Sequence, residues 1–136
     1  MQKPPFPYSY SAKIAGVVII ILSIISFFFR YYEDGTFELN QLATGSSWGF
    51  LFIFFSKEKT DDEMIQSLKF KALTWSIIIT FSLTCVYNYL FLYWWSKREH
   101  NISLSVSAFQ FFALMLIIAT ARFYYLKSQV ILNEEK

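Results

Sequence analysis

The residues best suited to chemistry in this chain gather in one short charged stretch. Positions 57–71 hold eight of the chain's 22 charged residues, four lysines and four acids. Strongly apolar runs flank the stretch on both sides. Its acids would repel anionic lipid headgroups, so they need a partner in the protein or in another polypeptide. The candidate structural or interaction residues here are Glu58, Thr60, Asp61, Asp62 and Glu63.

Arg122 is a further candidate, because it is the one charge in the body of the last apolar run. A charged side chain at the centre of a bilayer costs about 2.5–3.5 kcal/mol on insertion scales. Lys127 follows five residues later, roughly 7 Å along a helix. Arg122 therefore either reaches the inner headgroups as an anchor or forms an ion pair that fixes the charged stretch against the last helix. The possible acid partners are Glu58, Asp61, Asp62 and Glu63.

Three polar residues are candidates for contacts inside a membrane: Thr84, Asn88 and Gln110. Asn88 lies near the middle of the third apolar run, where an amide commonly hydrogen-bonds to another helix and contributes roughly 0.6–2 kcal/mol. The alternative is a polar cavity along one helix face, which helical spacing would form from Thr80, Thr84, Tyr87 and Asn88.

No catalytic, metal or cofactor site is expected. His100 is the only histidine, and it has no cysteine or aspartate companion at metal-ligand spacing. Cys85 is the only cysteine, and we expect it to be buried as a small apolar residue. The sequence contains no nucleophile elbow, P-loop or H-E-x-x-H motif. A net charge of +2 gives no electrostatic footprint for nucleic acid.

The composition requires lipid around the elements that carry these residues. The chain is 55% hydrophobic, 21% aromatic and only 16% charged, and a soluble domain of 136 residues could not bury that much apolar surface. Four apolar runs predict spans at about 12–32, 39–56, 72–95 and 102–126. The expected fold is thus an all-α integral membrane protein, a single domain forming a four-helix transmembrane bundle, with its third helix extended into the cytoplasm.

Two of the spans have alternatives. The first apolar run, residues 12–29, follows a basic residue and could be a signal peptide, but no small-residue cleavage site follows it. The second run is weakly apolar in its first half, so the other possibility is that only residues 48–55 enter the membrane, as a re-entrant segment. The small residues of this run suit close approach of another helix in lipid: Gly45, Ser46, Ser47 and Gly49.

The stretch Thr60-Asp61-Asp62-Glu63 predicts the start of the third helix as a capping box. The helix would begin outside the membrane in a hairpin at 57–71 and enter it near Lys71. Helical spacing predicts one apolar face made of Met64, Ile65, Leu68, Ala72 and Leu73. It assigns Asp62, Gln66 and Lys69 to another, polar face. After Leu126 we expect a short charged tail.

The basic residues predict the orientation. Four spans put both chain ends and the charged stretch on one side, which then holds eight lysines against three basic residues on the other, with Arg122 left out. The positive-inside rule makes this the cytoplasmic side, so the N and C termini are both expected inside. Three spans would separate the basic residues less cleanly.

The region around 54–63 resembles an uncharacterised group of small multi-pass membrane proteins of Bacteroidetes bacteria. The resemblance is carried by Phe55-Ser56-Lys57-Glu58-Lys59 followed by Asp62-Glu63, by the helix that reaches Trp75, and by Arg122-Phe123. It implies four helices and a location in the bacterial inner membrane. It implies no chemistry, because the group has no assigned activity.

These observations favour a non-enzymatic membrane subunit, accessory, regulatory or self-associating, that acts through helix contacts. Its expected partners are the lipid bilayer and either a second copy or another membrane protein. The alternative is an oligomeric channel or transporter subunit. Acids buried in the middle of a span would favour transport, and none of the three main spans has one.

Overall fold

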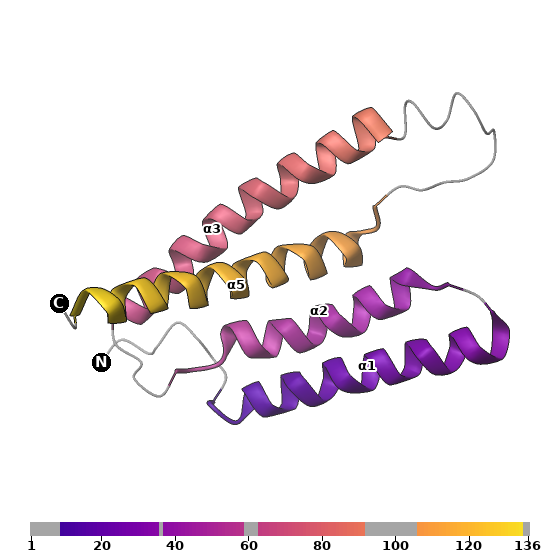
Figure 1. The fold of residues 1–136 in the computed structure, drawn as a ribbon, viewed down its shortest axis with the longest axis horizontal. Helices are drawn as coiled ribbons and strands as arrows, with labels where there is room; N and C mark the ends of the chain where they lie inside the picture. Colours follow the sequence, from indigo (N-terminus) through magenta and orange to yellow (C-terminus); the bar gives the residue numbers. More distant parts are fainter. Residues whose placement is uncertain (1–8, 36, 59–62, 92–105, 135–136) are drawn as a thin grey trace.

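The computed structural model describes residues 9–35, 37–58, 63–91 and 106–134, and most of these residues are helical (Figure 1). The helices are α1 (Ala12–Asp34), α2 (Leu39–Phe55), α3 (Glu63–Val86) and α5 (Ala108–Glu134). A π-helix, η1 (Tyr87–Phe91), continues α3. No strand occurs in these ranges, which confirms the all-α class.

The helices lie side by side in one layer, in the order α1, α2, α5, α3 (Figure 1). α2 packs on α1 and α5, and α5 packs on α2 and α3. α1 and α3 therefore form the two edges of the layer. The first turn of α1, the end of α2, the start of α3 and the end of α5 lie at the same end of the bundle (Figure 1). We call it the ion-pair end, after the contacts described below.

The α1–α2 contact depends on the absence of side chains at three glycines. A Cβ atom on Gly16 would lie 2.6 Å from the carbonyl oxygen of Gly49, and one on Gly49 would lie 2.4 Å from Cγ1 of Ile20. Gly45 lies against Ser23 in the same way. The predicted close approach of a helix to the small residues of 39–56 is thus confirmed, and the approaching helix is α1.

Gly35 ends α1. Its φ of 63° is in the left-handed region, and its N–H donates to the Tyr31 carbonyl oxygen at 3.1 Å. Glycine takes this conformation without a Cβ clash, so the chain can turn back from α1 into α2.

The core lies where the end of α2 meets α3 and α5. It is made of Phe54, Ile65, Ala72, Leu116, Ala119 and Phe123. Ala72 and Ala119 are fully buried, so the two long helices pack closely around small side chains. The phenylalanines fill the space toward the ion-pair end.

Among the described residues, three helices are long and apolar enough to cross a membrane: Ala12–Asp34, Glu63–Leu90 and Ala108–Leu132. The predicted second span forms α2, a helix of 17 residues. Most apolar side chains of α2 are buried or half-buried, whereas large apolar side chains are exposed along α1, α3 and α5, most densely along α1.

The last helix differs from the expected 102–126. Within the described part of the chain it begins at Ala108 and continues to Glu134, so residues expected as a charged tail are helical. The start is explained by a second capping box, in which the Ser107 N–H donates to Gln110 Oε1 at 3.2 Å and the Gln110 N–H donates to Ser107 Oγ at 3.3 Å. No glycine or proline follows Leu126 to end the helix.

The buried face of α3 also differs from the expectation. Its buried residues are Ile65, Lys69, Ala72, Ser76 and Thr80. The assignment of Lys69 to a polar face was therefore wrong, and Met64, expected on the apolar face, is exposed. The predicted capping box at Thr60 and the predicted end of the third span near Trp95 lie outside the described residues.

Candidate functional site

The best-defined polar site is built on Glu58, which follows the end of α2. Glu58 is only 8% exposed. Its Oε1 accepts a hydrogen bond from Lys13 Nζ, in the first turn of α1, and its Oε2 accepts one from Lys127 Nζ of α5 at 2.9 Å. We call Lys13, Glu58 and Lys127 the Glu58 clamp. It connects two helices, α1 and α5, that are separated by α2 in the layer.

Lys69 of α3 makes a separate contact with the segment that follows α2. Its side chain is 1% exposed, and its Nζ donates to the carbonyl oxygen of Ser56. The Nζ also lies 5.3 Å from the centre of the Phe123 ring, a cation–π distance. The long apolar stem of lysine lets this residue cross the α3–α5 interface and place its charge on the backbone that leaves α2.

The clamp keeps Glu58 ionised. Burial alone would raise the pKa of the Glu58 carboxyl, but the hydrogen bonds from Lys13 and Lys127 and their positive charges outweigh burial and hold the pKa below its ordinary value of 4.5. Both carboxylate oxygens are occupied by the lysines. A saturated carboxylate with a lowered pKa is poorly suited to act as a general base, so the arrangement favours a structural role.

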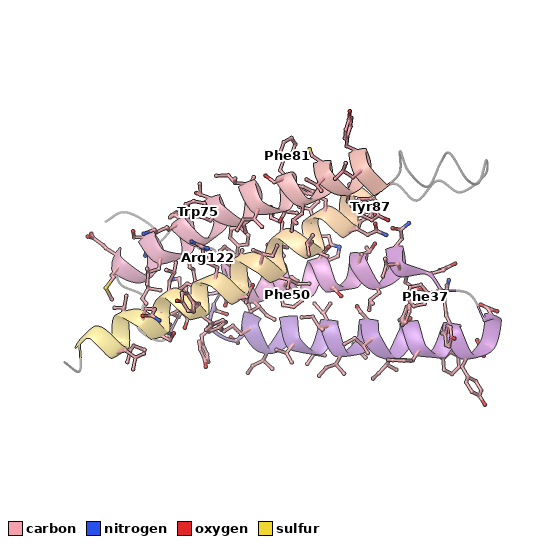
Figure 2. All side chains as sticks on the ribbon, turned by 45° about the horizontal axis from the view of Figure 1, so that its top comes forward. Phe37, Phe50, Trp75, Phe81, Tyr87 and Arg122 are labelled. Atoms are coloured by element: carbon pink, nitrogen blue, oxygen red, sulfur yellow. The ribbon has the colours of Figure 1, made fainter. Side chains whose placement is uncertain are left out.

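Arg122 lies on α5 beside Trp75 of α3, with its Cζ 5.1 Å from the centre of the ring (Figure 2). Its Nε is buried and has no hydrogen-bond partner. Of the four acids considered as partners, Glu58 pairs with the two lysines and Glu63 is exposed. Asp61 and Asp62, like Thr60, lie outside the described residues. Within the described ranges, no acid pairs with Arg122.

The three intramembrane candidates occupy different surroundings. Gln110 lies between helices, where its Nε2 donates to Asn40 Oδ1 of α2 at 2.9 Å. Ser107 Oγ donates to the same oxygen at 2.8 Å. Thr84 is half-buried on α3, and Asn88 is exposed on η1. The expected burial of Cys85 was wrong, because Cys85 is exposed on α3.

A groove of about 440 Å³ runs between α2, η1 and α5. Gln110 and Tyr87 line it together with Ser46, and the rest of its lining is apolar. Thr84 and Asn88 are not among its lining residues, so the structure does not bring the three candidates to one cavity. Thr80, one helical turn before Thr84, is fully buried, and its hydroxyl has no hydrogen-bond partner.

Sequence reasoning did not assign these contacts to the residues that complete them: Lys13, Lys69, Lys127, Asn40 and Ser107. One of them carried a usable signal. Ser107 and Gln110 have the S-x-x-Q spacing of a capping box, the same pattern that was recognised at Thr60–Glu63. The lysines carried none, because partners 45 and 69 positions apart leave no local pattern.

Comparisons of the chain with protein families, with curated proteins and with solved structures give no match. In the ranges that the structure describes, no group of three histidine, cysteine or acidic residues is placed to hold a metal ion. The function is therefore argued from the geometry of this chain.

Replacing Glu58 by glutamine is expected to destabilise the fold. The change removes the charge that Lys13 and Lys127 share, and a hydrogen bond to a charged group contributes about 1.5–3 kcal/mol. We expect a loss of that size in the free energy of unfolding in detergent, measured by denaturant or thermal melts. Glu63→Gln is the matched control, because Glu63 is exposed and its loss should cost less than about 0.5 kcal/mol. Equal effects of the two substitutions would contradict a structural role for the clamp.

The clamp also predicts a pH dependence. The pKa of Glu58 is lower in the folded than in the unfolded protein, so its ionised form stabilises the fold above the ordinary pKa of 4.5, and this contribution is lost as the pH falls through the folded-state pKa. The melting temperature of the wild type should therefore approach that of Glu58→Gln between about pH 5 and pH 3. A gap between the two proteins that is unchanged over this range would show that Glu58 does not titrate with folding.

Proposed function

We propose that this chain is an integral membrane protein that acts through helix contacts rather than by catalysis. Large apolar side chains are exposed along α1, α3 and α5, and a soluble monomer rarely exposes contiguous apolar patches of this kind. Lipid is the solvent that accommodates them. The ion pairs and the backbone turns lie at the ends of the helices, where a bilayer would meet water.

The proposed orientation places the ion-pair end inside. With four spans, the sequence would put nine basic and six acidic residues, Arg122 included, on the side of that end, against three basic and four acidic residues on the other side. The positive-inside rule favours the cytoplasm for the first group. In this arrangement α2 is a fourth span, held in place by α1 and α5 on its two sides. The resemblance to Bacteroidetes proteins favours the bacterial inner membrane.

The observation that carries a role in helix contacts is a groove between α1 and α2, of about 490 Å³, in which polar side chains lie in a mainly apolar surface. Its lining includes four polar side chains, Ser23, Ser26, Gln41 and Thr44. Gln41 Nε2 donates to Ser26 Oγ at 3.1 Å, but Gln41 Oε1 is buried without a partner. Polar groups at helix surfaces in lipid favour hydrogen bonds across helices. A helix seated in this groove would supply the missing donor, and a second copy of this chain is the simplest source.

The alternative, an oligomeric channel or transporter subunit, would place a path between copies. Polar side chains at helix surfaces are compatible with both self-association and a channel. The two proposals must therefore be distinguished by measurements on the same protein in liposomes.

Cysteine labelling tests the orientation. In a Cys85→Ala background, Asp34→Cys should react with a membrane-impermeant maleimide in intact cells, because Asp34 follows the proposed inside-to-outside span. Ser128→Cys should react only after the membrane is permeabilised. Both positions are exposed in the structure, so access from the correct side is not limited by burial. The reverse pattern, or labelling of both from outside, would contradict the proposed topology.

Self-association is tested with Gln41→Leu. An interhelical hydrogen bond in lipid contributes roughly 0.6–2 kcal/mol, so the substitution should weaken association about three- to thirtyfold. Energy transfer between labelled copies in liposomes measures the change, and Gln129→Leu, at an exposed site on α5, is the matched control. A wild-type protein that stays monomeric would contradict self-association. Ion flux across the same liposomes would favour the channel alternative.

A further inference from the structure

Arg122 and Trp75 form a cationic and aromatic pair at the surface of the α3–α5 interface (Figure 2). The Trp75 ring covers the guanidinium at 5.1 Å, and Trp75 itself is 45% exposed. Arg122 is partly buried. A molecule outside the helix layer can therefore reach the pair, and in the proposed membrane arrangement that molecule would be a lipid.

The guanidinium of Arg122 lacks an anionic partner among the described residues. Its Nε is buried without a hydrogen bond. Glu58, the buried acid among the described residues, has both oxygens occupied by Lys13 and Lys127. An aromatic ring balances part of the positive charge, but it accepts none of the in-plane N–H hydrogen bonds that a guanidinium can donate. An anion with several acceptor oxygens would accept them.

The position of the pair along the helices matches the headgroup level of a bilayer. Arg122 is five residues from Lys127, which belongs to the clamp at the ion-pair end. Phe123, the next residue, lies 5.3 Å from the buried Lys69 ammonium. Tryptophan prefers the membrane–water interface, and arginine directs its charge there.

Neighbouring residues of α3 extend the site in two directions. Lys71 is exposed and precedes Trp75 by four residues, so it lies on the same face of α3, one turn nearer the ion-pair end. Ile78 follows Trp75 by three residues and is 52% exposed, one turn deeper in the proposed membrane. Positive charge thus lies on the side of the pair nearer the ion-pair end, and an apolar surface lies on the side deeper in the proposed membrane.

We propose that Arg122, Trp75 and Lys71 bind the headgroup of an anionic phospholipid. Arginine presents N–H donors in a planar fork that matches phosphate oxygens, and lysine adds a second positive charge. Trp75 packs on the glycerol region, and an acyl chain follows the apolar surface at Ile78. This surface distinguishes a lipid from free phosphate, which would use the basic groups alone. The inference rests on the proposed membrane insertion and is independent of self-association.

Native mass spectrometry of the detergent-purified full chain tests this site. The protein is mixed with equal amounts of phosphatidylglycerol and phosphatidylcholine, and the ratio of the two bound lipids is measured. We expect the wild type to prefer phosphatidylglycerol. Arg122→Gln should lower the ratio about fivefold, which corresponds to the ~1 kcal/mol that one basic residue contributes near an anionic surface. Arg30→Gln is the matched control, since Arg30 lies at the opposite end and pairs with Glu38, and it should leave the ratio unchanged.

Two further variants keep the test decisive if Arg122→Gln does not fold. Arg122→Lys retains the charge without the planar fork and should give an intermediate ratio. Lys71→Gln, at an exposed position, should lower the ratio on its own. Equal binding of the two lipids by the wild type would overturn the proposal, as would an unchanged preference in the Arg122 variants.

Thermal melts separate a lipid from free phosphate. Phosphatidylglycerol should raise the melting temperature of the wild type more than that of Arg122→Lys, and the same concentration of inorganic phosphate should raise neither. Equal stabilisation by inorganic phosphate would overturn the assignment to a lipid. A monomeric protein that keeps the lipid preference would contradict self-association alone, whereas failure to insert into membranes would remove both proposals.

Discussion

The rest of the structure depends on one constraint: a carboxylate buried at the end of the helix layer must be paired. Removing Glu58 from water is costly, and the attraction of two lysines offsets the cost only if their geometry is held. Lys13 and Lys127 provide this geometry from α1 and α5, two helices with α2 between them. The clamp therefore fixes the register of three helices at once, while Lys69 fixes the connection between α2 and α3 through the Ser56 carbonyl.

Beyond the clamp, the helices pack through small residues. The two glycines Gly16 and Gly49 let α1 and α2 approach closely, and the two alanines Ala72 and Ala119 do the same for α3 and α5. In lipid, helices gain little from burying apolar side chains against one another, so close contact between small residues is the main source of packing energy. The helices form a single layer in which many large apolar side chains are exposed. Such a layer is consistent with the membrane location proposed for it.

The parts of this structure that could be predicted from sequence are local. Apolar run length predicted the helices, and the small residues of 39–56 predicted a close neighbour without identifying it as α1. The clamp could not be predicted, because its partners lie 45 and 69 positions from Glu58 and many lysines were available. Lys69 was placed on the wrong face because a charge was read as a sign of exposure. Lys69 is buried because its long side chain reaches the Ser56 carbonyl oxygen, which accepts a hydrogen bond from the ammonium group.

The distribution of cations at the ion-pair end follows from the chemistry of the two basic side chains. Lysine is a compact charge on a flexible stem, which suits acceptors reached through a narrow gap, such as the Glu58 oxygens and the Ser56 carbonyl. Arginine spreads its charge over a plane and loses less on leaving water, which suits a position against the Trp75 ring. Because the lysines occupy both oxygens of Glu58, Arg122 is left with a permanent charge that this acid does not neutralise. A protein that fixes its own structure with lysines and keeps arginine against an exposed tryptophan retains a cation for an anion outside the fold, and in a membrane the most abundant such anion is a lipid phosphate.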